Sequence, residues 1–122
     1  MPLFIASLYG IMLYSQPIMT YAPTRTITVE VSAYNSCPEQ CSGNHFITAS
    51  GLKLQAGDKV VATNFLPFGT KVNIDGVLYR VEDRMAERYN RTIDIWFGAC
   101  SPENIRKAKA FGRQIKEIKV YE

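Results

Sequence analysis

The segment KVNIDGVLYRVE, residues 71 to 82, decides the fold class of this chain. Apolar and polar side chains alternate on both sides of Asp75-Gly76, as they do in strands with one buried face. Asp-Gly is favoured in two-residue hairpin turns because both central residues need a positive φ. The segment therefore predicts two antiparallel strands, over residues 71–74 and 77–82, joined by a tight turn.

More strands are predicted outward from this hairpin in both directions. The clearest has the sequence TITVEVSAY, in which Ile27, Val29 and Val31 alternate with polar side chains. The full set of further predicted strands is residues 26–34, 59–63, 92–97 and 114–121. Many short strands favour a closed barrel, because closure removes the exposed edges that they would otherwise leave.

One helix is predicted, late in the chain. Ser101 supplies a hydroxyl cap, Pro102 suits the first helical position, and Glu103 places an acid in the first turn. The helix should run to about Phe111 and end at Gly112. The expected order is strand, loop, strand, turn, hairpin, loop, strand, helix, strand, and a surface loop is expected over residues 35–44.

Composition places the chain among single-domain globular proteins. Its 122 residues, 47% hydrophobic and 20% charged, suffice for one core and argue against disorder. The net charge of +3 is mild, and basic residues alternate with acidic ones instead of forming a block. We therefore expect no nucleic-acid binding. We also expect a monomer.

The first 24 residues carry no charged side chain, unlike the rest of the chain. Leu3 to Tyr14 form an apolar run of the length found in signal peptides and too short for a comfortable membrane span. We interpret residues 1–25 as a signal peptide or N-terminal anchor, with possible membrane attachment, and residues 26–122 as the domain. The protein would then be secreted or lie in the cell envelope. The alternatives are a buried N-terminal element of the fold or a start truncated upstream.

The cysteines are compatible with export. Three residues separate Cys37 from Cys41 in a loop with Pro38, so a disulfide between them is predicted, which leaves Cys100 unpaired. His45 is the single histidine and has no ligand pattern around it. We expect neither a metal nor a cofactor.

Two carboxylates stand out as candidates for chemistry. Asp83 ends the second hairpin strand, and Asp94 lies in the middle of a predicted strand, on the same face as Trp96. An acid beside an indole and partly removed from water resists ionisation, as a general acid near neutral pH must. The alternatives are that Asp83 caps a turn or pairs with Arg84, that Asp94 is solvated, and that Trp96 is barrel packing.

Five motifs, in order and at compatible spacings, resemble those of the three-aspartate (3D) domain. They are Thr48-Ala49-Ser50-Gly51, residues 61–72 (VATNFLPFGTKV), Val81-Glu82-Asp83-Arg84, residues 91–97 (RTIDIWF) and Phe111-Gly112-Arg113. The resemblance spans about residues 27 to 121. It implies a mainly β fold, a six-stranded double-psi β-barrel with one short C-terminal helix. The family barrel is similar to that of membrane-bound lytic transglycosylase A, and part of the pattern resembles rare lipoprotein A and the expansins.

The resemblance also implies a function on peptidoglycan glycan strands of bacterial cell walls. Asp83 matches the second family aspartate and Asp94, eleven residues later, the third. Asp94 is implied to protonate the glycosidic oxygen between N-acetylmuramic acid and N-acetylglucosamine, and then to act as base while a 1,6-anhydro ring closes without water. Asp83 would support it. Substrate contacts are expected from six further side chains: Trp96, Tyr89, Thr48, Ser50, Asn64 and Arg84.

The chain departs from the family pattern in two places. Asn64 replaces the first aspartate, and residues 85–90 (MAERYN) replace a glycine-rich stretch with a bulkier and more charged loop. A non-catalytic wall- or carbohydrate-binding barrel, in the manner of the expansins, is therefore the second hypothesis, with stacking surface from Trp96, Tyr89 and Phe68. A purely structural or partner-binding domain is the third.

Overall fold

The computed structural model describes residues 22–38 and 45–122, and the predicted hairpin forms in it as β3 (Lys71–Ile74) and β4 (Val77–Asp83). Asp75 has φ 53° and Gly76 φ 84°, so both turn residues adopt the left-handed backbone that Asp-Gly tolerates. Asn73 also accepts a hydrogen bond from the Gly76 N–H at 3.0 Å. The hairpin prediction is confirmed.

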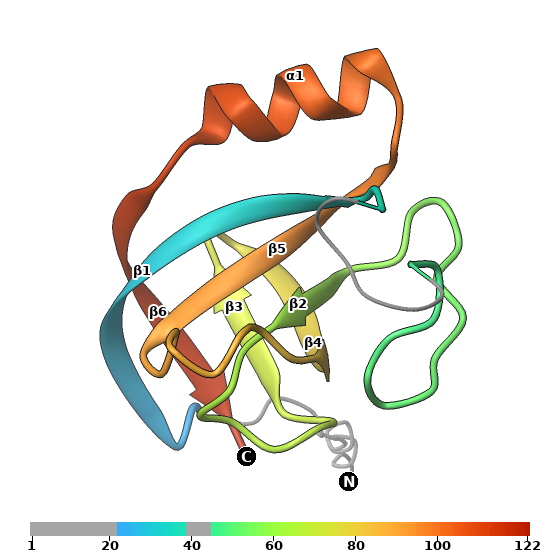
Figure 1. Ribbon diagram of the computed structural model, residues 1–122. Coiled ribbons are helices and arrows are strands. Elements are labelled where there is room, and N and C mark those ends of the chain that lie inside the picture. The colour runs from blue at the N-terminus through green and yellow to red at the C-terminus, as the bar shows by residue number, and fades with distance from the viewer. Residues whose placement is uncertain (1–21, 39–44) are drawn as a thin grey trace, which may run out of the picture.

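The other strands close a barrel with this hairpin. They are β1 (Arg25–Ser36), β2 (Val60–Ala62), β5 (Thr92–Ala99) and β6 (Gln114–Tyr121). Around the barrel the order is β1-β5-β2-β4-β3-β6, and β6 pairs with β1 to complete the circle (Figure 1). The β1–β5 and β2–β4 pairs are parallel and the other four pairs are antiparallel. The expected mainly β, six-stranded barrel with one short C-terminal helix is confirmed.

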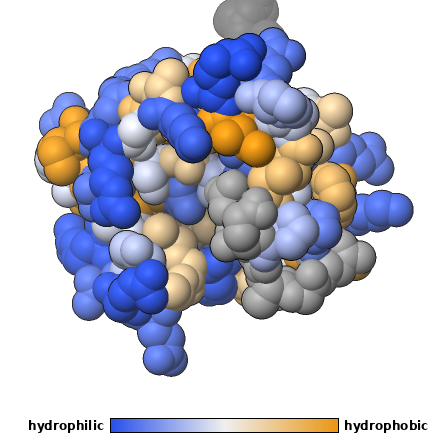
Figure 2. Space-filling model, turned by 45° about the horizontal axis from the view of Figure 1, so that its top comes forward, coloured by the Kyte–Doolittle hydropathy of each residue, from blue (hydrophilic) through white to orange (hydrophobic). Residues whose placement is uncertain are grey.

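The helix α1 (Pro102–Phe111) also forms where the capping residues predict it. The Ser101 hydroxyl accepts a hydrogen bond from the Asn104 N–H at 3.1 Å, and the helix ends at Gly112, whose φ is 64°. α1 runs over β1 and β5 (Figure 1), and Phe111 meets Phe97 edge to face with ring centroids 5.4 Å apart. The face seen near α1 is largely hydrophilic, with hydrophobic residues in small patches (Figure 2).

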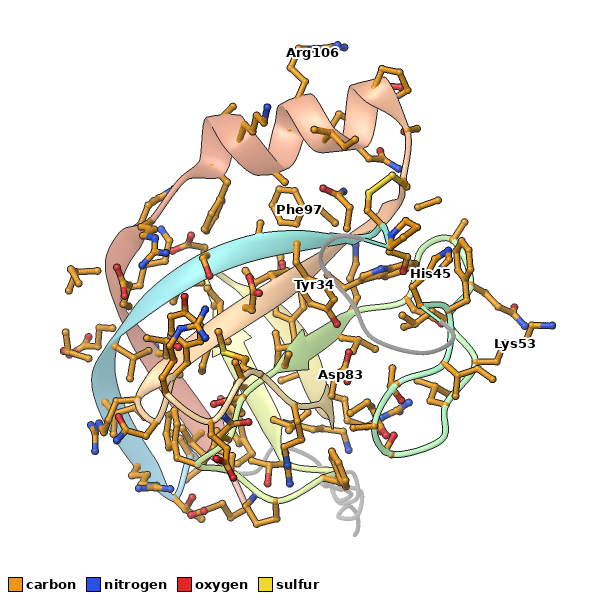
Figure 3. The ribbon with its side chains drawn as sticks, viewed as in Figure 1. Tyr34, His45, Lys53, Asp83, Phe97 and Arg106 are labelled. Atoms are coloured by element: carbon orange, nitrogen blue, oxygen red, sulfur yellow. A yellow bond between two sulfur atoms is a disulfide. The ribbon has the colours of Figure 1, made fainter. Side chains whose placement is uncertain are left out.

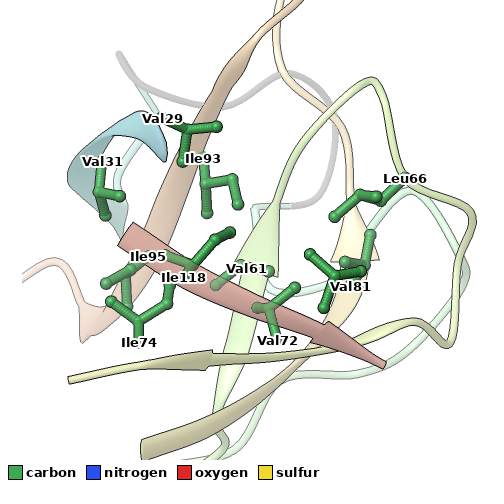
Figure 4. Packing of buried hydrophobic residues seen from close by; sticks show 11 residues of the cluster. Val29, Val31, Val61, Leu66, Val72, Ile74, Val81, Ile93, Ile95 and Ile118 are labelled. Carbon is green, nitrogen blue, oxygen red and sulfur yellow. The ribbon is translucent and has the colours of Figure 1, made fainter. Parts of the chain in front are cut away.

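The barrel interior is filled by one cluster of branched aliphatic side chains, all at most 4% exposed (Figure 4). Each comes from the inward positions of a strand or from the turn before β3. The members are Val29, Val31, Val61, Leu66, Val72, Ile74, Val81, Ile93, Ile95, Ile118 and Val120. Burial of this kind contributes about 25 cal/mol per Å² of apolar surface, so the cluster is the main source of fold stability.

The structure corrects two expectations about residues 35–37, the start of the predicted loop. β1 continues to Ser36, and Asn35, Ser36 and Cys37 are at most 1% exposed, because the long β1 pairs with β5 as far as Ala99. Cys37 forms a disulfide with Cys100 and not with Cys41. The disulfide joins the end of β1 to the segment before α1, two points that only the parallel β1–β5 pairing brings together (Figure 3).

Some expectations concern segments outside the described residues. Cys41 lies there, as do residues 1–21 of the predicted signal peptide or anchor. In the described part of the chain, α1 is too short and too polar to cross a membrane.

Candidate active site

A single row of side chains crosses neighbouring strands on the outer face of the barrel. Ala62 on β2 is paired with Asp94 of β5 on one side and with Asp83 of β4 on the other. Asp94 is paired in turn with Ser32 of β1. Residues at one register level of adjacent strands project from the same face, so both predicted acids face the same side. Two interstrand spacings separate their Cα atoms, which is about 10 Å.

An irregularity in β4 is what brings Asp83 onto this face. Val61 pairs with Val81, but the next residue, Ala62, pairs with Asp83, so Glu82 is the extra residue of a β-bulge. Strict alternation would have sent Asp83 into the barrel with Val81. The bulge turns Asp83 outward, toward the face of Ala62 and Asp94.

Asp94 is held in an environment that favours its protonated form. The Ser32 hydroxyl donates a hydrogen bond to Asp94 Oδ1 at 2.9 Å. Burial raises the pKa of Asp94 from 3.8 to about 6, and the negative charge of Asp83 adds to this. The Ser32 hydrogen bond and the Arg113 cation act in the opposite direction but do not outweigh burial. Near neutral pH this carboxyl can therefore both donate and accept a proton.

Asp83 has different surroundings, because three hydrogen-bond donors surround its carboxylate. The Tyr34 hydroxyl donates to Oδ2 at 2.8 Å, and Figure 3 shows Tyr34 reaching from β1 toward it. The N–H groups of Ala49 and Arg84 donate to Oδ1 at 2.9 and 3.0 Å. Asp83 is thereby oriented rigidly, which suits an electrostatic role better than proton transfer.

Thr48 and Ser50 hold the turn that carries the Ala49 donor. Their hydroxyls lie 2.9 Å apart, and Ser50 Oγ donates to Glu82 Oε1 at 2.5 Å. The Ser50 N–H donates to the Glu82 carbonyl at 3.1 Å, which fastens the turn to the bulge. Both residues therefore support Asp83, and any contact of Thr48 with substrate would have to be indirect because its side chain is buried.

Asn64 and Arg84 organise the loops on either side of the bulge. The Asn64 amide donates to the carbonyls of Ala86 and Tyr89 and accepts from the Met85 N–H at 2.9 Å. Arg84 donates to the carbonyls of Thr63 and Leu66. In this structure Asn64 anchors the 85–90 loop through its amide, a task that a carboxylate could not perform because it has no N–H donors.

Trp96 does not offer a stacking surface. It lies on the same face of β5 as Asp94 but is only 6% exposed, and its indole N–H donates to Ser36 Oγ at 2.8 Å. It belongs to a second buried cluster that also holds Tyr34, Leu54, Val60 and Ala62. Trp96 is therefore packing beneath the row, which was the alternative interpretation of this residue.

Trp96 also borders a hollow of about 450 Å³ beside the start of α1. Its other walls come from the 54–59 segment, from β5 between Ile95 and Ala99, and from the start of α1, together with Phe46 and Tyr79. Neither Asp83 nor Asp94 lines it.

Tyr89 and Arg113 lie at the far end of the row. Arg113 directly precedes Gln114, the β6 partner of Val31, so it lies across from Ser32 and extends the row by one strand. Tyr89 is partly exposed, and its pKa is lowered first by a hydrogen bond from Arg88 and then by Arg113. The row thus has an acid at one end, Asp94 in the middle and a cation at the other end.

Sequence reasoning missed Ser32, Tyr34 and Arg113 as members of this site. Ser32 was visible only as a polar residue on the outward face of a strand, and Arg113 only as the end of the last motif. A parallel pairing between β1 and β5 could not be read from either strand alone. That pairing is what places Ser32 against Asp94.

Among residues 22–38 and 45–122, no group of three or more His, Cys, Asp or Glu side chains is arranged to hold a metal ion. Comparison with known proteins adds no assignment, since neither a protein-family model nor a curated protein matches the chain.

Proposed function

We propose that this barrel is a peptidoglycan lytic transglycosylase-like enzyme with Asp94 as its acid and base. The observation that carries the proposal is the Asp94 carboxyl, whose pKa is raised to about 6 on a face it shares with Asp83. The resemblance to the 3D domain supplies the substrate class, glycan strands with the N-acetylmuramic acid to N-acetylglucosamine bond.

The proposed reaction needs one proton and no water. Protonated Asp94 gives its proton to the glycosidic oxygen as the bond from that oxygen to C1 of the muramic residue breaks. The C6 hydroxyl of the same sugar then bonds to C1, and its proton passes to the Asp94 carboxylate. The acid is thereby regenerated, so a single titrating carboxyl is sufficient for the cycle.

Asp83 fits the role of an electrostatic partner. All three of its hydrogen bonds come from protein donors, so its oxygens are already engaged and are poorly suited to activate water. Its negative charge helps to keep Asp94 protonated and would favour positive charge developing at C1. This division of labour supports ring closure over hydrolysis, which usually employs two free acids.

The disulfide supports an extracytoplasmic location. Stable disulfides form mainly in secreted and envelope proteins, and Cys37–Cys100 closes a loop of sequence separation 63. Location in the envelope would place the enzyme beside its proposed substrate.

The first prediction tests the proposal directly. Incubation of the purified protein with peptidoglycan sacculi should release anhydro-muropeptides, and Asp94→Asn should lower the rate at least about 1,000-fold because the proton donor is lost. Mass spectrometry of the soluble products measures both. Above about pH 6 the wild-type rate should fall about tenfold per pH unit, since the acid form disappears.

Asp75→Asn is the matched control. Asp75 is exposed in the hairpin turn, and Asn tolerates its positive φ. This variant should keep the wild-type rate. Product release by Asp94→Asn at the wild-type rate would refute the proposal.

A non-catalytic carbohydrate-binding barrel is the second candidate, and exposed aromatic surface favours it. Phe68 is 42% exposed, with the Arg84 guanidinium 3.8 Å from its ring centre. Sacculus binding that survives Asp94→Asn but is lost in Phe68→Ala, without anhydro product, would support this function instead.

A further inference from the structure

We propose that Arg113 binds a carboxylate carried by the substrate, which makes this barrel selective for acidic glycans over neutral ones. The inference rests on the proposed function and deepens it, because it assigns a charged group of the substrate to one end of the row.

Arg113 lies on the same face of the barrel as Asp94. The register Asp94–Ser32 on β5 and β1, continued to β6, places Arg113 on the outer face two strands from Asp94. Two interstrand spacings correspond to about 10 Å between the Cα atoms. If the scissile bond of a glycan lies at Asp94, a substituent on the sugar beside that bond would therefore be within reach of the Arg113 side chain.

The Arg113 guanidinium is free to bind a ligand. Its side chain is 64% exposed, and its ion partner, Glu30 Oε2, lies 3.7 Å from Nη1. That distance exceeds a good hydrogen bond, and exposed pairs of this kind contribute little to stability. The other neighbour of Arg113 is Tyr89, whose pKa it lowers, and the Arg113 side chain remains mostly exposed beside both partners. Arg113 can thus turn its guanidinium to a ligand carboxylate, which guanidinium groups bind through two parallel N–H donors.

Further cations lie on the loop that carries Tyr89. The Arg88 guanidinium sits 4.7 Å from the Tyr89 ring centre and donates to the Tyr89 hydroxyl at 3.3 Å, and Arg113 also lowers the pKa of Tyr89. Arg91 lies on the same loop and packs over Phe65, with 5.5 Å between its guanidinium and the ring centre. Within the loop itself, residues 85–91 carry two cations, Arg88 and Arg91, and one acid, Glu87. The opposite end carries Asp83 and would repel a carboxylate.

The test compares two forms of one ligand. Peptide-free peptidoglycan glycan strands carry a free carboxyl on each muramic residue, and carbodiimide coupling to ammonia converts these to neutral amides. The purified full chain should bind the acidic strands about tenfold more tightly than the amidated ones in a co-sedimentation assay, as expected for one charge-assisted contact.

Three variants locate the effect. Arg113→Gln should abolish the tenfold preference while leaving binding to amidated strands unchanged, and Arg113→Lys should retain part of the preference. Arg106→Gln is the matched control, because Arg106 is an exposed arginine of α1 that points away from the barrel (Figure 3). It should keep the full preference.

Two results would overturn the inference. One is an Arg113→Gln variant with undiminished preference, and the other is an equal loss of affinity for both ligands. The assay measures binding and is therefore separate from catalysis. A wild-type protein that releases no anhydro product but still prefers acidic strands would refute the proposed enzyme activity and still support the carboxylate site.

Discussion

The interior of the barrel and the row on its outer face are built from the same strands, yet they obey different rules. β5 shows the contrast most clearly: Ile93 and Ile95 are at most 3% exposed inside the barrel, while Asp94 between them faces outward. The interior is uniform, apolar and closed. The row holds two acids, a hydroxyl and a cation, and each depends on a particular neighbour.

In this small domain, stability comes mainly from one face of the strands and the candidate chemistry from the other. Interior side chains lower the free energy of the fold through burial, and many of them can share the task. Members of the row instead carry specific contacts, and Asp94 is retained at a cost, since burying a carboxyl opposes its ionisation. Substitutions on the two faces should therefore have effects of different kinds.

The largest effect on stability should come from the interior. Ile93→Ala removes a fully buried side chain from the centre of the cluster and should lower the unfolding free energy by about 2–5 kcal/mol, measured by urea denaturation. Ile115→Ala is the matched control, because Ile115 is 71% exposed on β6. It should change the unfolding free energy by less than about 0.5 kcal/mol. Equal losses at both positions would remove the distinction between the two faces.

The second-largest effect should come from Asp94. Here the substitution should raise the unfolding free energy relative to wild type instead of lowering it. Its folded-state pKa is raised, so its stabilising contribution is complete below the ordinary pKa of 3.8 and is lost as the pH rises to about 6. The Asp94→Asn variant has no titrating carboxyl at this position, so its unfolding free energy does not fall in this way as the pH rises. Relative to wild type, the variant should gain about 3 kcal/mol in unfolding free energy between pH 3 and pH 7, measured by urea denaturation at both values. No relative gain would mean that Asp94 titrates as an ordinary surface acid.

The smallest effect should come from a residue that joins the row to the buried cluster beneath it. Tyr34 is buried in the second cluster, while its hydroxyl donates to Asp83. Tyr34→Phe keeps the packing and removes one of three donors, so we expect a loss of about 1.5 kcal/mol in thermal or urea unfolding and a several-fold slower release of anhydro product. Tyr121→Phe at the end of β6 serves as control. An unchanged rate with reduced stability would give Tyr34 a structural role alone.

The interior was largely predictable from the sequence, because its signals are local. The Asp75-Gly76 turn, the alternation along β1 and β5, and the Ser101 cap each act over a few residues. Such signals depend on backbone geometry and amphipathicity, which hold whatever the distant partner is. The strand order around the barrel had no comparable local signal.

The row was predictable only in part. Asp83 and Asp94 were identified by position and by resemblance, but their arrangement on one face depends on the bulge at Glu82, which leaves no mark in the alternation of β4. Trp96 looked like a binding surface because period-two alternation gives the face of a side chain and not what covers that face. Ser36 and the second cluster cover it.

The cysteines make the same point about distance along the chain. Cys37 and Cys41 are close in sequence, but closeness in sequence does not decide which cysteines form a disulfide in a folded protein. The arrangement of the strands decides which sulfur atoms meet. Parallel pairing of β1 with β5 brings Cys100 to Cys37 across a separation of 63 residues.

By itself, the sequence determined the kinds of element, their limits to within a few residues and the apolar faces that drive their assembly. The tertiary structure alone decided which outward side chains became neighbours: Ser32 with Asp94, Tyr34 with Asp83, and Arg113 across from Ser32. The physical reason is that local backbone preferences and burial act within a strand, whereas a site depends on the register between strands, and register is settled only when the barrel closes.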